Sequence, residues 1–464
     1  MGAIAGVFGS SENPREVVEN LLWALRHRGT KTRVGPMEEE RAGWAIGCSS
    51  NDGLESHFLE SAKGVLALNG SFFHRKNHAK FALKRVVKGT TRHAVTALMS
   101  EPGEFAVLGI LRNHMFAFRD LNGLKPLYYA GHREFVAFAS ERKALWRIGM
   151  REVKRVHPGH VYSIGERGTT QTPLAMIRRL PEKPIAFEKA ASQLTQLLKR
   201  SSRRVTKGVE RVAVAFSGGL DSAVAAALAK NISRVELISV GLIDSPELTT
   251  VEKYAHEIDL PITIVPFELD SLEDYVRRVV WLIEEPNLMK VSVAIPLHWA
   301  AMVAARRGYP VMLCGQGSDE LYGGYYKYAK ILDTKGRAAL VDALNRSVIE
   351  ASQVNYERDE QTTAPFGVEL RTPFADLDVV RFSQTIPSAY KVRAGNDVTR
   401  KWILRSVAKG LGLPEDIVWR RKKAIQHGTG VENALRKLAK NQNLTTESYL
   451  VKIHAEVKDL DSMP

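Results

Sequence analysis

The sequence predicts two domains of different fold class: an α+β domain built on antiparallel sheets, followed by an α/β domain built on a parallel sheet. Three observations support this prediction. At 464 residues the chain is too long for one ordinary hydrophobic core. Its first 165 residues hold short β-like runs separated by turn residues, a pattern typical of antiparallel sheets. From residue 186, strand-like and helix-like segments alternate, which favours a largely parallel sheet.

The N-terminal domain is expected over residues 1–167. Helical patterns near 14–27 and 76–88 interrupt its β-like runs. Residues 168–185 lose periodicity and contain prolines, so we expect a linker there. The β-like runs are AIAGVFG, GVLALNGSFF, EFAVLGIL, HMFAFRD, PLYYA, EFVAFAS and GHVYSIG.

The C-terminal domain is expected over residues 186–440, with a polar tail at 441–464. It opens with an amphipathic helix candidate, AFEKAASQLTQLLKRSSRRV, and its last third has mainly helical patterns. A strand at 211–216 meets a helix that begins near Leu220. The other strand candidates are RVELISVGL, LPITIVPF and GYPVMLCG, with VEKYAHEI as a helix between the first two.

Composition and charge are those of a globular protein. The excess of 66 Lys and Arg over 51 Asp and Glu gives a net charge of +15, which suits anionic ligands such as ATP or tRNA and equally an ordinary solvated surface. Two cysteines, Cys48 and Cys314, are too few for a Cys-rich zinc site. The chain has no uninterrupted apolar stretch of 18 residues and no signal-peptide pattern, so we expect a cytoplasmic protein with no membrane partner.

The segment VAVAFSGGLDS, residues 212–222, has the composition of a phosphate-binding loop. An apolar strand ends in Ser-Gly-Gly and a helix follows, so unpaired backbone N–H groups and the positive end of a helix dipole would face an anion. A plain capped turn would need only the Ser-Gly-Gly part. The additional carboxylate of Asp221 fits a Mg²⁺ ligand that bridges phosphates. The predicted nucleotide-binding residues are Ser217, Gly218, Gly219, Leu220, Asp221 and Ser222.

A second apolar strand runs into a carboxylate-bearing loop one hundred residues later, in VMLCGQGSDELYGGYYKY (311–328). Two loops at the carboxyl edge of one parallel sheet face the same crevice. We therefore expect Asp221 and Asp319 to share one Mg²⁺ and the triphosphate of ATP. The alternative is that Asp319 and Glu320 simply cap a helix. The further nucleotide-site residues predicted are Val240, Gly315, Gln316 and Gly317.

Residues 217–222 resemble the pyrophosphate-binding loop of the ATP pyrophosphatase superfamily, and the two loops together resemble the synthetase domain of asparagine synthetases. ERDEQTTAPFGVELRTPFADLDVVRF and RKWILRSVAKGLGLPEDIVWRRKKAIQHGTGV are similar to further blocks of that family. The resemblance implies an adenine nucleotide alpha hydrolase-like fold, ATP and Mg²⁺ as cofactors, and release of AMP and pyrophosphate. The catalytic residues that it implies are Asp319, Gln316 and Lys422, the last placed two positions after Arg420 to neutralise charge on the intermediate.

Residues 1–165 resemble the class II glutamine amidotransferase domain of the same enzymes, through GAIAGVFG, ALRHRG, ALNGSFF, MFAFRDLNGLKPLYYA and FASERKAL. The resemblance implies an Ntn-type αββα sandwich. The family hydrolyses glutamine with a cysteine whose own α-amino group is the base, and here Gly2 stands at that position. Cys48 lacks a free α-amine, and Ser71 replaces the acidic residue after the family's Asn-Gly pair. We therefore expect a domain that does not hydrolyse glutamine.

These patterns predict an ATP-dependent carbon–nitrogen ligase that adenylates the carboxylate of aspartate or a related small molecule and transfers ammonia or an amine to it. Asparagine synthetases have an acidic residue where this chain has Gln316, which leaves the acceptor open. Nitrogen would come from ammonia, from a separate ammonia-supplying subunit, or from a substrate amine, as in the β-lactam synthetases that the pattern also resembles. The sequence also leaves open whether the protein forms a homodimer. The alternatives are a tRNA base-modifying enzyme of the archaeosine type and a non-catalytic nucleotide-binding scaffold.

Overall fold

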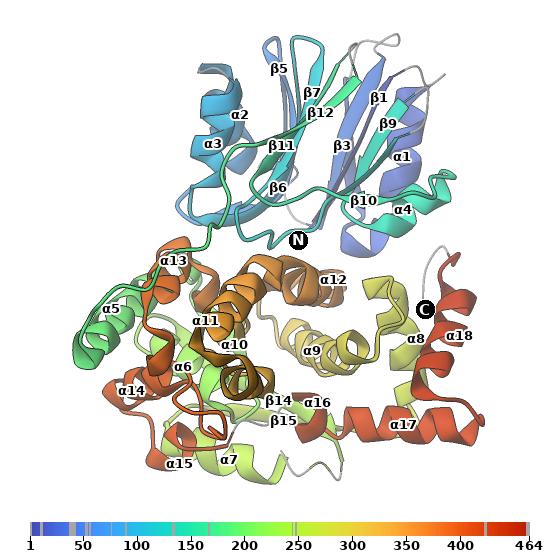
Figure 1. Cartoon of the computed structure of the whole chain (residues 1–464). Helices are drawn as coiled ribbons and strands as arrows, with labels where there is room; N and C mark the ends of the chain where they lie inside the picture. Colours follow the sequence, from blue (N-terminus) through green and yellow to red (C-terminus); the bar gives the residue numbers. More distant parts are fainter. Residues whose placement is uncertain are drawn as a thin grey trace. The chain divides into compact units, whose positions relative to one another are not determined.

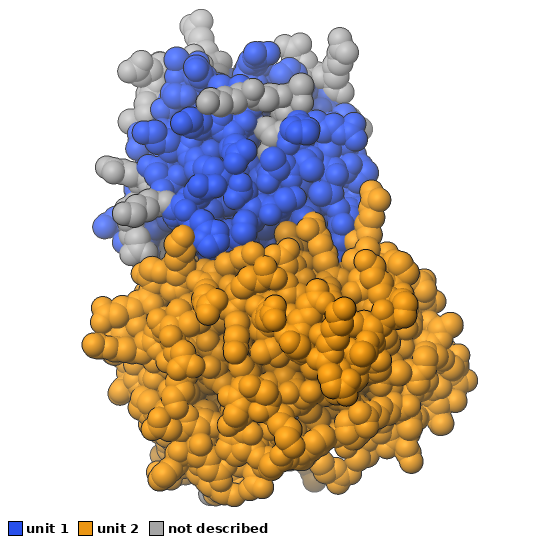
Figure 2. All heavy atoms as spheres, turned by 90° about the vertical axis from the view of Figure 1, so that its left-hand side faces the viewer, with its two compact units in different colours: residues 1–177, 364–367, 455–464 blue, residues 178–363, 368–454 orange. Residues whose placement is uncertain are grey.

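The chain divides into two compact units, which Figure 2 colours separately: residues 1–177, 364–367 and 455–464 form unit 1, and residues 178–363 and 368–454 form unit 2. The structure is a computed structural model. It describes every residue except 1, 10–12, 37–42, 52, 53, 55, 56, 76, 89, 90, 132–134, 166, 167, 244, 246, 247, 422–424 and 461–464.

Unit 1 is an αββα sandwich, as the fold class predicts (Figure 1). Its two antiparallel sheets have the strand orders β10-β8-β9-β1-β3-β2 and β12-β11-β7-β6-β5-β4. The first sheet comprises β1 (Gly2–Gly9), β2 (Lys31–Gly35), β3 (Trp44–Ser50), β8 (Tyr128–Gly131), β9 (Phe135–Ala139) and β10 (Lys154–Arg155). The second comprises β4 (Phe58–Ser61), β5 (Gly64–Phe72), β6 (Gly103–Leu111), β7 (His114–Arg119), β11 (His160–Gly165) and β12 (Gly168–Pro173).

Two helix pairs cover the outer faces of this sandwich: α1 (Pro14–Ala24) with α4 (Arg142–Arg147), and α2 (His78–Lys88) with α3 (Thr91–Met99). Strand β1 shows how the sequence makes these layers. Ala3 and Val7 pack in the cluster that holds α1, whereas Ile4 packs in the cluster between the two sheets. Successive side chains of a strand point to opposite faces, so one apolar run supplies both cores.

The expected linker and the expected tail both contain regular structure. Strand β12 pairs antiparallel with β11, so residues 168–173 of the predicted linker belong to a sheet. Its side chains are mostly exposed and polar, and the hydrophobic alternation that marks a strand is therefore missing. In the predicted polar tail lies α18 (Thr446–Val457), which buries Tyr449, Ile453 and Val457. Their spacing of four residues marks the apolar face of a helix.

Unit 2 is built on a parallel five-stranded sheet with the order β15-β14-β13-β16-β17, which confirms the α/β prediction. The strands are β13 (Arg211–Ala215), β14 (Arg234–Leu242), β15 (Ile262–Phe267), β16 (Val311–Leu313) and β17 (Glu369–Arg371). The chain moves outward from β13 to β15 and then returns to place β16 on the other side of β13. The carboxyl ends of β13 and β16 therefore border the topological switch point, where ligands of such sheets bind.

Helices surround this sheet (Figure 1). They are α5 (Phe187–Val205), α6 (Leu220–Ala229), α7 (Leu248–Glu257), α8 (Leu272–Ile283), α9 (Leu288–Arg306), α10 (Ser318–Tyr322), α11 (Tyr326–Ala351), α12 (Glu357–Thr363), α13 (Leu377–Thr385), α14 (Trp402–Gly410), α15 (Glu415–Val418), α16 (Ile425–Gly428) and α17 (Val431–Asn441). Helix α9 packs on β13 and β14. Among the described helices, only α9 has the length and apolar composition of a membrane span, and 72% of the relevant window is buried in the protein.

Candidate active site

The two predicted loops meet at the switch point of the unit 2 sheet. The first joins β13 to α6, and the second joins β16 to α10. They approach so closely that a Cβ on Gly315 would lie 2.6 Å from the Cβ of Asp221. Only glycine fits at this position without moving the first turn of α6. The two motifs, which lie far apart in the sequence, thus form one continuous site.

The first loop holds its shape through its own hydroxyls. The Ser217 backbone N–H donates to Ser222 Oγ at 3.3 Å, and Ser222 Oγ donates to the Gly219 carbonyl at 3.1 Å. Gly218 has φ +65°, a conformation that L side chains rarely adopt. Gly219 is the N-cap of α6, so the loop leads directly into the unpaired N–H groups of a ten-residue helix. This arrangement is suited to an anion.

The C-terminal block reaches the same loop through Arg420. Its Nη1 donates to the Gly218 carbonyl at 2.8 Å, and its guanidinium lies 5.2 Å from the ring centroid of Tyr254. Lys422, the lysine singled out from the sequence, lies outside the described residues. Its role therefore stays a prediction.

A lysine that the sequence analysis did not single out lies between the two predicted metal ligands. Lys401 Nζ is 2.6 Å from Asp221 Oδ1, 2.5 Å from Asp319 Oδ1 and 2.9 Å from Ser318 Oγ. Ser318 Oγ also donates to Asp221 Oδ1 at 2.6 Å. The Lys401 side chain is 3% exposed, so these charges attract one another with little screening by water. The two carboxylates thus flank a single cation.

Gly324 makes room for this arrangement. A Cβ there would lie 1.7 Å from Asp319 Oδ1 and 2.2 Å from Lys401 Cε. Gly324 therefore lets Lys401 pack against the carboxylate of Asp319. A signal for Lys401 was available in the block RKWILR, but that block has no spacing that distinguishes its lysine from others nearby.

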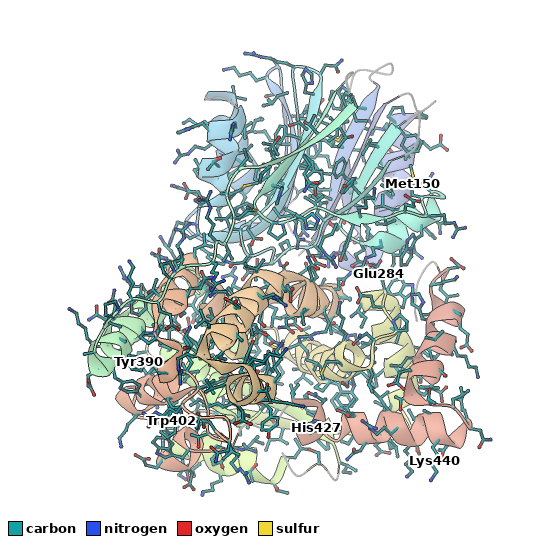
Figure 3. All side chains as sticks on the ribbon, viewed as in Figure 1. Met150, Glu284, Tyr390, Trp402, His427 and Lys440 are labelled. Atoms are coloured by element: carbon teal, nitrogen blue, oxygen red, sulfur yellow. The ribbon has the colours of Figure 1, made fainter. Side chains whose placement is uncertain are left out.

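The backbone that presents Lys401 is strained. Arg400 and Lys401 have φ 47° and 54°, the left-handed region in which two consecutive non-glycine residues are rare. Asp397 accepts hydrogen bonds from the backbone N–H groups of Thr399 and Arg400 and from Trp402 Nε1. Trp402 begins α14 directly after Lys401 and is labelled in Figure 3. Arg400 Nε donates to the Gly324 carbonyl at 3.0 Å, which ties this turn to the second loop.

Asp319 and Glu320 face different surroundings although they are neighbours. Glu320 is 3% exposed; Asn355 Nδ2 donates to its Oε1 at 2.7 Å, and the Tyr325 hydroxyl donates to the same oxygen. Burial, followed by the charge of Asp319, raises the pKa of Glu320. Glu320 therefore anchors the loop from inside the unit, and only Asp319 joins Asp221 at the site.

Gln316 and Val240 lie at the carboxyl edge of the sheet. The Gln316 carbonyl accepts a hydrogen bond from Thr372 Oγ1 at 2.7 Å. Burial raises the pKa of Asp359, and hydrogen bonds from Arg358 and Gln316 oppose that rise. Gly317 follows with φ +89° and packs against Tyr356. Val240 is buried in β14 near the end of that strand. A contact of Val240 with a nucleotide stays a prediction.

The paired carboxylates fit Mg²⁺, which binds hard oxygen ligands through one or two carboxylates and substrate phosphates. Asp221 and Asp319 converge from two elements, and the structure already places a cation, the Lys401 ammonium, between them. The ligand assignment stays a prediction, since the described residues contain no cluster of three or more metal-ligating side chains.

The structure describes Gly2, Asn69 and Gly70, positions of the motif that the sequence analysis discusses in unit 1. Asn69 is 1% exposed, and neither atom of its side-chain amide has a hydrogen-bond partner among the described residues. Gly70 has φ +105°, and a Cβ on it would lie 1.9 Å from the Glu104 carbonyl oxygen. At Gly2 a Cβ would lie 2.1 Å from the Ser49 carbonyl oxygen in the adjacent strand. The strand pairing therefore occupies the space that a cysteine side chain would need.

The two units define a class of protein in which an amidotransferase-like αββα sandwich precedes an α/β domain with a predicted nucleotide-binding loop. The family model described as asparagine synthase matches residues 193–362 and 342–452. The model described as a glutamine amidotransferase domain matches residues 86–197. The chain belongs to the asparagine synthase family.

Curated proteins with similar sequences are named as asparagine synthetases. The chain is 32% identical over 381 residues to "Putative asparagine synthetase [glutamine-hydrolyzing] 1" of Methanocaldococcus jannaschii, covering 72% of this chain and 70% of the relative. It is 25% identical over 432 residues to "Asparagine synthetase B [glutamine-hydrolyzing]" of Escherichia coli, covering 84% and 75%. Among solved structures, a glutamine phosphoribosylpyrophosphate amidotransferase from B. subtilis matches with 14% identity and a TM-score of 0.34, covering 56% of this chain and 80% of that chain.

Proposed function

We propose that this protein is an ATP-dependent ligase of the asparagine synthetase type, which adenylates a small-molecule carboxylate and transfers a nitrogen to it with release of AMP and pyrophosphate. The observation that carries the proposal is the Asp221–Lys401–Asp319 cluster beside the Ser-Gly-Gly loop at the switch point. Family membership supports an ATP-dependent ligase. The matched families give the tRNA-modifying and scaffold alternatives no support.

The chain's own groups suit this reaction at three places. The backbone N–H groups at the start of α6 would hold the pyrophosphate that leaves, because they are fixed donors at the positive end of a helix dipole. Asp221 and Asp319 would hold Mg²⁺, which when bound supplies charge neutralisation for the triphosphate. Lys401 adds a fixed positive charge at the same point, and Arg420 adds another at the first loop.

We propose further that unit 1 does not hydrolyse glutamine. Gly2 offers no thiol, and its backbone lies too close to Ser49 for a larger side chain. The retained Asn69-Gly70 pair alone supplies no nucleophile. Nitrogen then comes from free ammonia, from an amine on the substrate or from a separate subunit. Some relatives are named as glutamine-hydrolysing. Those names describe the relatives and do not assign glutamine hydrolysis to this chain.

Pyrophosphate release tests the proposed function. The protein is incubated with Mg²⁺·ATP and, in turn, aspartate, other amino acids and tRNA, each with ammonia or with glutamine. We expect pyrophosphate and AMP in equal amounts with at least one small carboxylate and ammonia, and no turnover with glutamine. The Asp221→Asn variant should lose this activity. Asp378→Asn, which changes an α13 carboxylate paired with Arg204 of α5, should keep it. Phosphate and ADP as products would refute the proposal, and turnover with glutamine would refute the inactive unit 1.

A further inference from the structure

The buried guanidinium of Arg405 holds the backbone of the turn that presents Lys401. Arg405 lies on α14, four residues after Lys401, and is 2% exposed. Its Nε donates to the Arg400 carbonyl at 2.8 Å, and its Nη2 donates to the Thr399 carbonyl. One side of the guanidinium therefore fixes the two peptide groups directly before Lys401.

The other side of the same guanidinium holds the segment of Arg420. Nη1 of Arg405 donates to the Arg420 carbonyl at 3.2 Å and also to the Val418 carbonyl. Arg420 in turn donates from its Nη1 to the Gly218 carbonyl of the first loop at 2.8 Å. A single side chain thus links the turn that presents Lys401 to the segment whose arginine contacts the predicted pyrophosphate-binding loop.

Packing alone does not explain an arginine at this position. The four hydrogen bonds of Arg405 end on main-chain carbonyl oxygens and none of them on a carboxylate. A buried charge is costly, and a carbonyl compensates it less than a carboxylate does. Burial lowers the pKa of Arg405, and the charges of Asp221 and Asp397 oppose that change. A guanidinium donates from several nitrogens in fixed directions, whereas the ammonium of lysine donates from a single atom.

Two aromatic side chains join the same two segments independently of these hydrogen bonds. Trp402 begins α14, and Trp419 follows α15. Their rings meet edge to face, with centroids 5.7 Å apart. Because the rings contact each other directly, we expect the two segments to stay together when Arg405 is replaced, and only their alignment to change.

We propose that Arg405 is a positioning residue, which couples Lys401 and Arg420 so that both positive charges are fixed at the phosphates of ATP before the reaction. The inference rests on the proposed function and adds a residue that neither loop contains. Charges fixed in advance stabilise a transition state without having to move into place during the reaction. Without Arg405, Lys401 and Arg420 would keep their charges but lose their fixed places.

The cost of removing Lys401, measured with and without Arg405, tests this inference. Pyrophosphate release is measured with Mg²⁺·ATP, ammonia and the carboxylate acceptor that supports turnover. In the otherwise unaltered protein, Lys401→Met should lower kcat by about 100-fold or more. Arg405→Lys keeps the charge but should lower kcat by about tenfold or more, because one atom cannot hold both segments. In that background, Lys401→Met should lower kcat by about tenfold at most, since the two residues act as a unit.

Arg119→Lys is the matched control. Arg119 ends β7 in unit 1 and is fully buried. Like Arg405, it donates to main-chain carbonyls, those of Gly123, Lys125 and Val156. In this background the cost of Lys401→Met should stay at about 100-fold or more. A merely structural role for Arg405 would give the same unchanged cost in Arg405→Lys.

The outcomes separate this inference from the proposed function. An unchanged cost of Lys401→Met in folded Arg405→Lys protein, or a kcat of Arg405→Lys equal to that of the unaltered protein, overturns the role of Arg405 alone. Absence of pyrophosphate release by the unaltered protein overturns the proposed function and this inference with it. If Arg405→Lys does not fold, the double variant Lys401→Met/Arg420→Met serves as the test. A coupled pair should lose less activity together than the product of the two single losses, and losses that multiply overturn the inference.

Discussion

At the scale of single residues, the site depends on one lysine held in a strained conformation. A non-glycine residue in the left-handed region costs on the order of 1–3 kcal/mol, and Arg400 and Lys401 both adopt it. The strain persists because Asp397, Gly324 and the two carboxylates hold the turn from several sides. Such strain is typical of functional sites, and here it aims Lys401 Nζ between Asp221 and Asp319.

Replacing Lys401 by methionine should lower kcat for pyrophosphate release by about 100-fold or more, because a fixed charge at the phosphates is lost. The variant should remain folded, which thermal unfolding checks. Lys409→Met is the control: this lysine lies on α14, the helix that follows Lys401, but it is 66% exposed and pairs with Glu415. A Lys401 variant as active as the control would contradict the assignment.

At the scale of elements, the turn before α14 works as one unit built around Asp397. Burial raises the pKa of this carboxyl, but hydrogen bonds from the backbone N–H groups of Arg393 and Arg400 and from Trp402 outweigh burial, and its pKa is lowered. A carboxyl whose pKa is lower in the folded state stabilises the fold above its unfolded-state pKa. This contribution is lost as the pH falls through the folded-state value.

Asp397→Asn should therefore destabilise unit 2 by about 1.5–3 kcal/mol at neutral pH, the range for hydrogen bonds to a charged group. The difference from the unaltered protein should shrink as the pH falls below the ordinary pKa of aspartate, since both side chains are then neutral. Denaturant unfolding at several pH values measures this. A constant difference across that range would contradict the role of the charge.

The second prediction at the scale of elements concerns strand β1. Gly2 pairs with Ser50 of β3, and the Ser49 carbonyl oxygen occupies the place of a Cβ. Gly2→Cys should therefore fail to create glutaminase activity, and it should destabilise unit 1 because the strand pairing must shift. Glutamate release from glutamine is the measurement, with Gly410→Cys as a control at a position that has free space. Glutamine hydrolysis by the Gly2 variant would show that only the thiol is missing.

Much of the fold could be predicted at this scale, and the failures have physical reasons. Apolar runs of the right period gave α5, β13, α6, β14 and β15, because burial sets those periods. Strand β12 was missed because an exposed edge strand needs no apolar face. Strand β17 was missed because it has only three residues, Glu369–Arg371, and its ends are charged.

At the scale of the whole molecule, the sequence order of the motifs was enough to bring Asp221 and Asp319 together, because the carboxyl ends of neighbouring parallel strands share an edge. Lys401 and Asp359 could not be found in this way. Lys401 lies in the turn before α14 and Asp359 on α12, at no fixed spacing from the sheet strands, so only the packed structure brings them to the loops. The two carboxylates predicted to bind Mg²⁺ could thus be found from the sequence, whereas the residues that surround them could not.

The central claim is that the site activates a carboxylate by transferring AMP to it, and transfer of oxygen tests this most directly. The acceptor that supports turnover is labelled with ¹⁸O in its carboxylates and incubated with Mg²⁺·ATP and ammonia, and the AMP is examined by mass spectrometry. We expect one ¹⁸O atom in each AMP, because the carboxylate oxygen that attacks the α-phosphorus leaves with AMP when nitrogen displaces it. Unlabelled AMP, or ADP with labelled phosphate, would contradict the account.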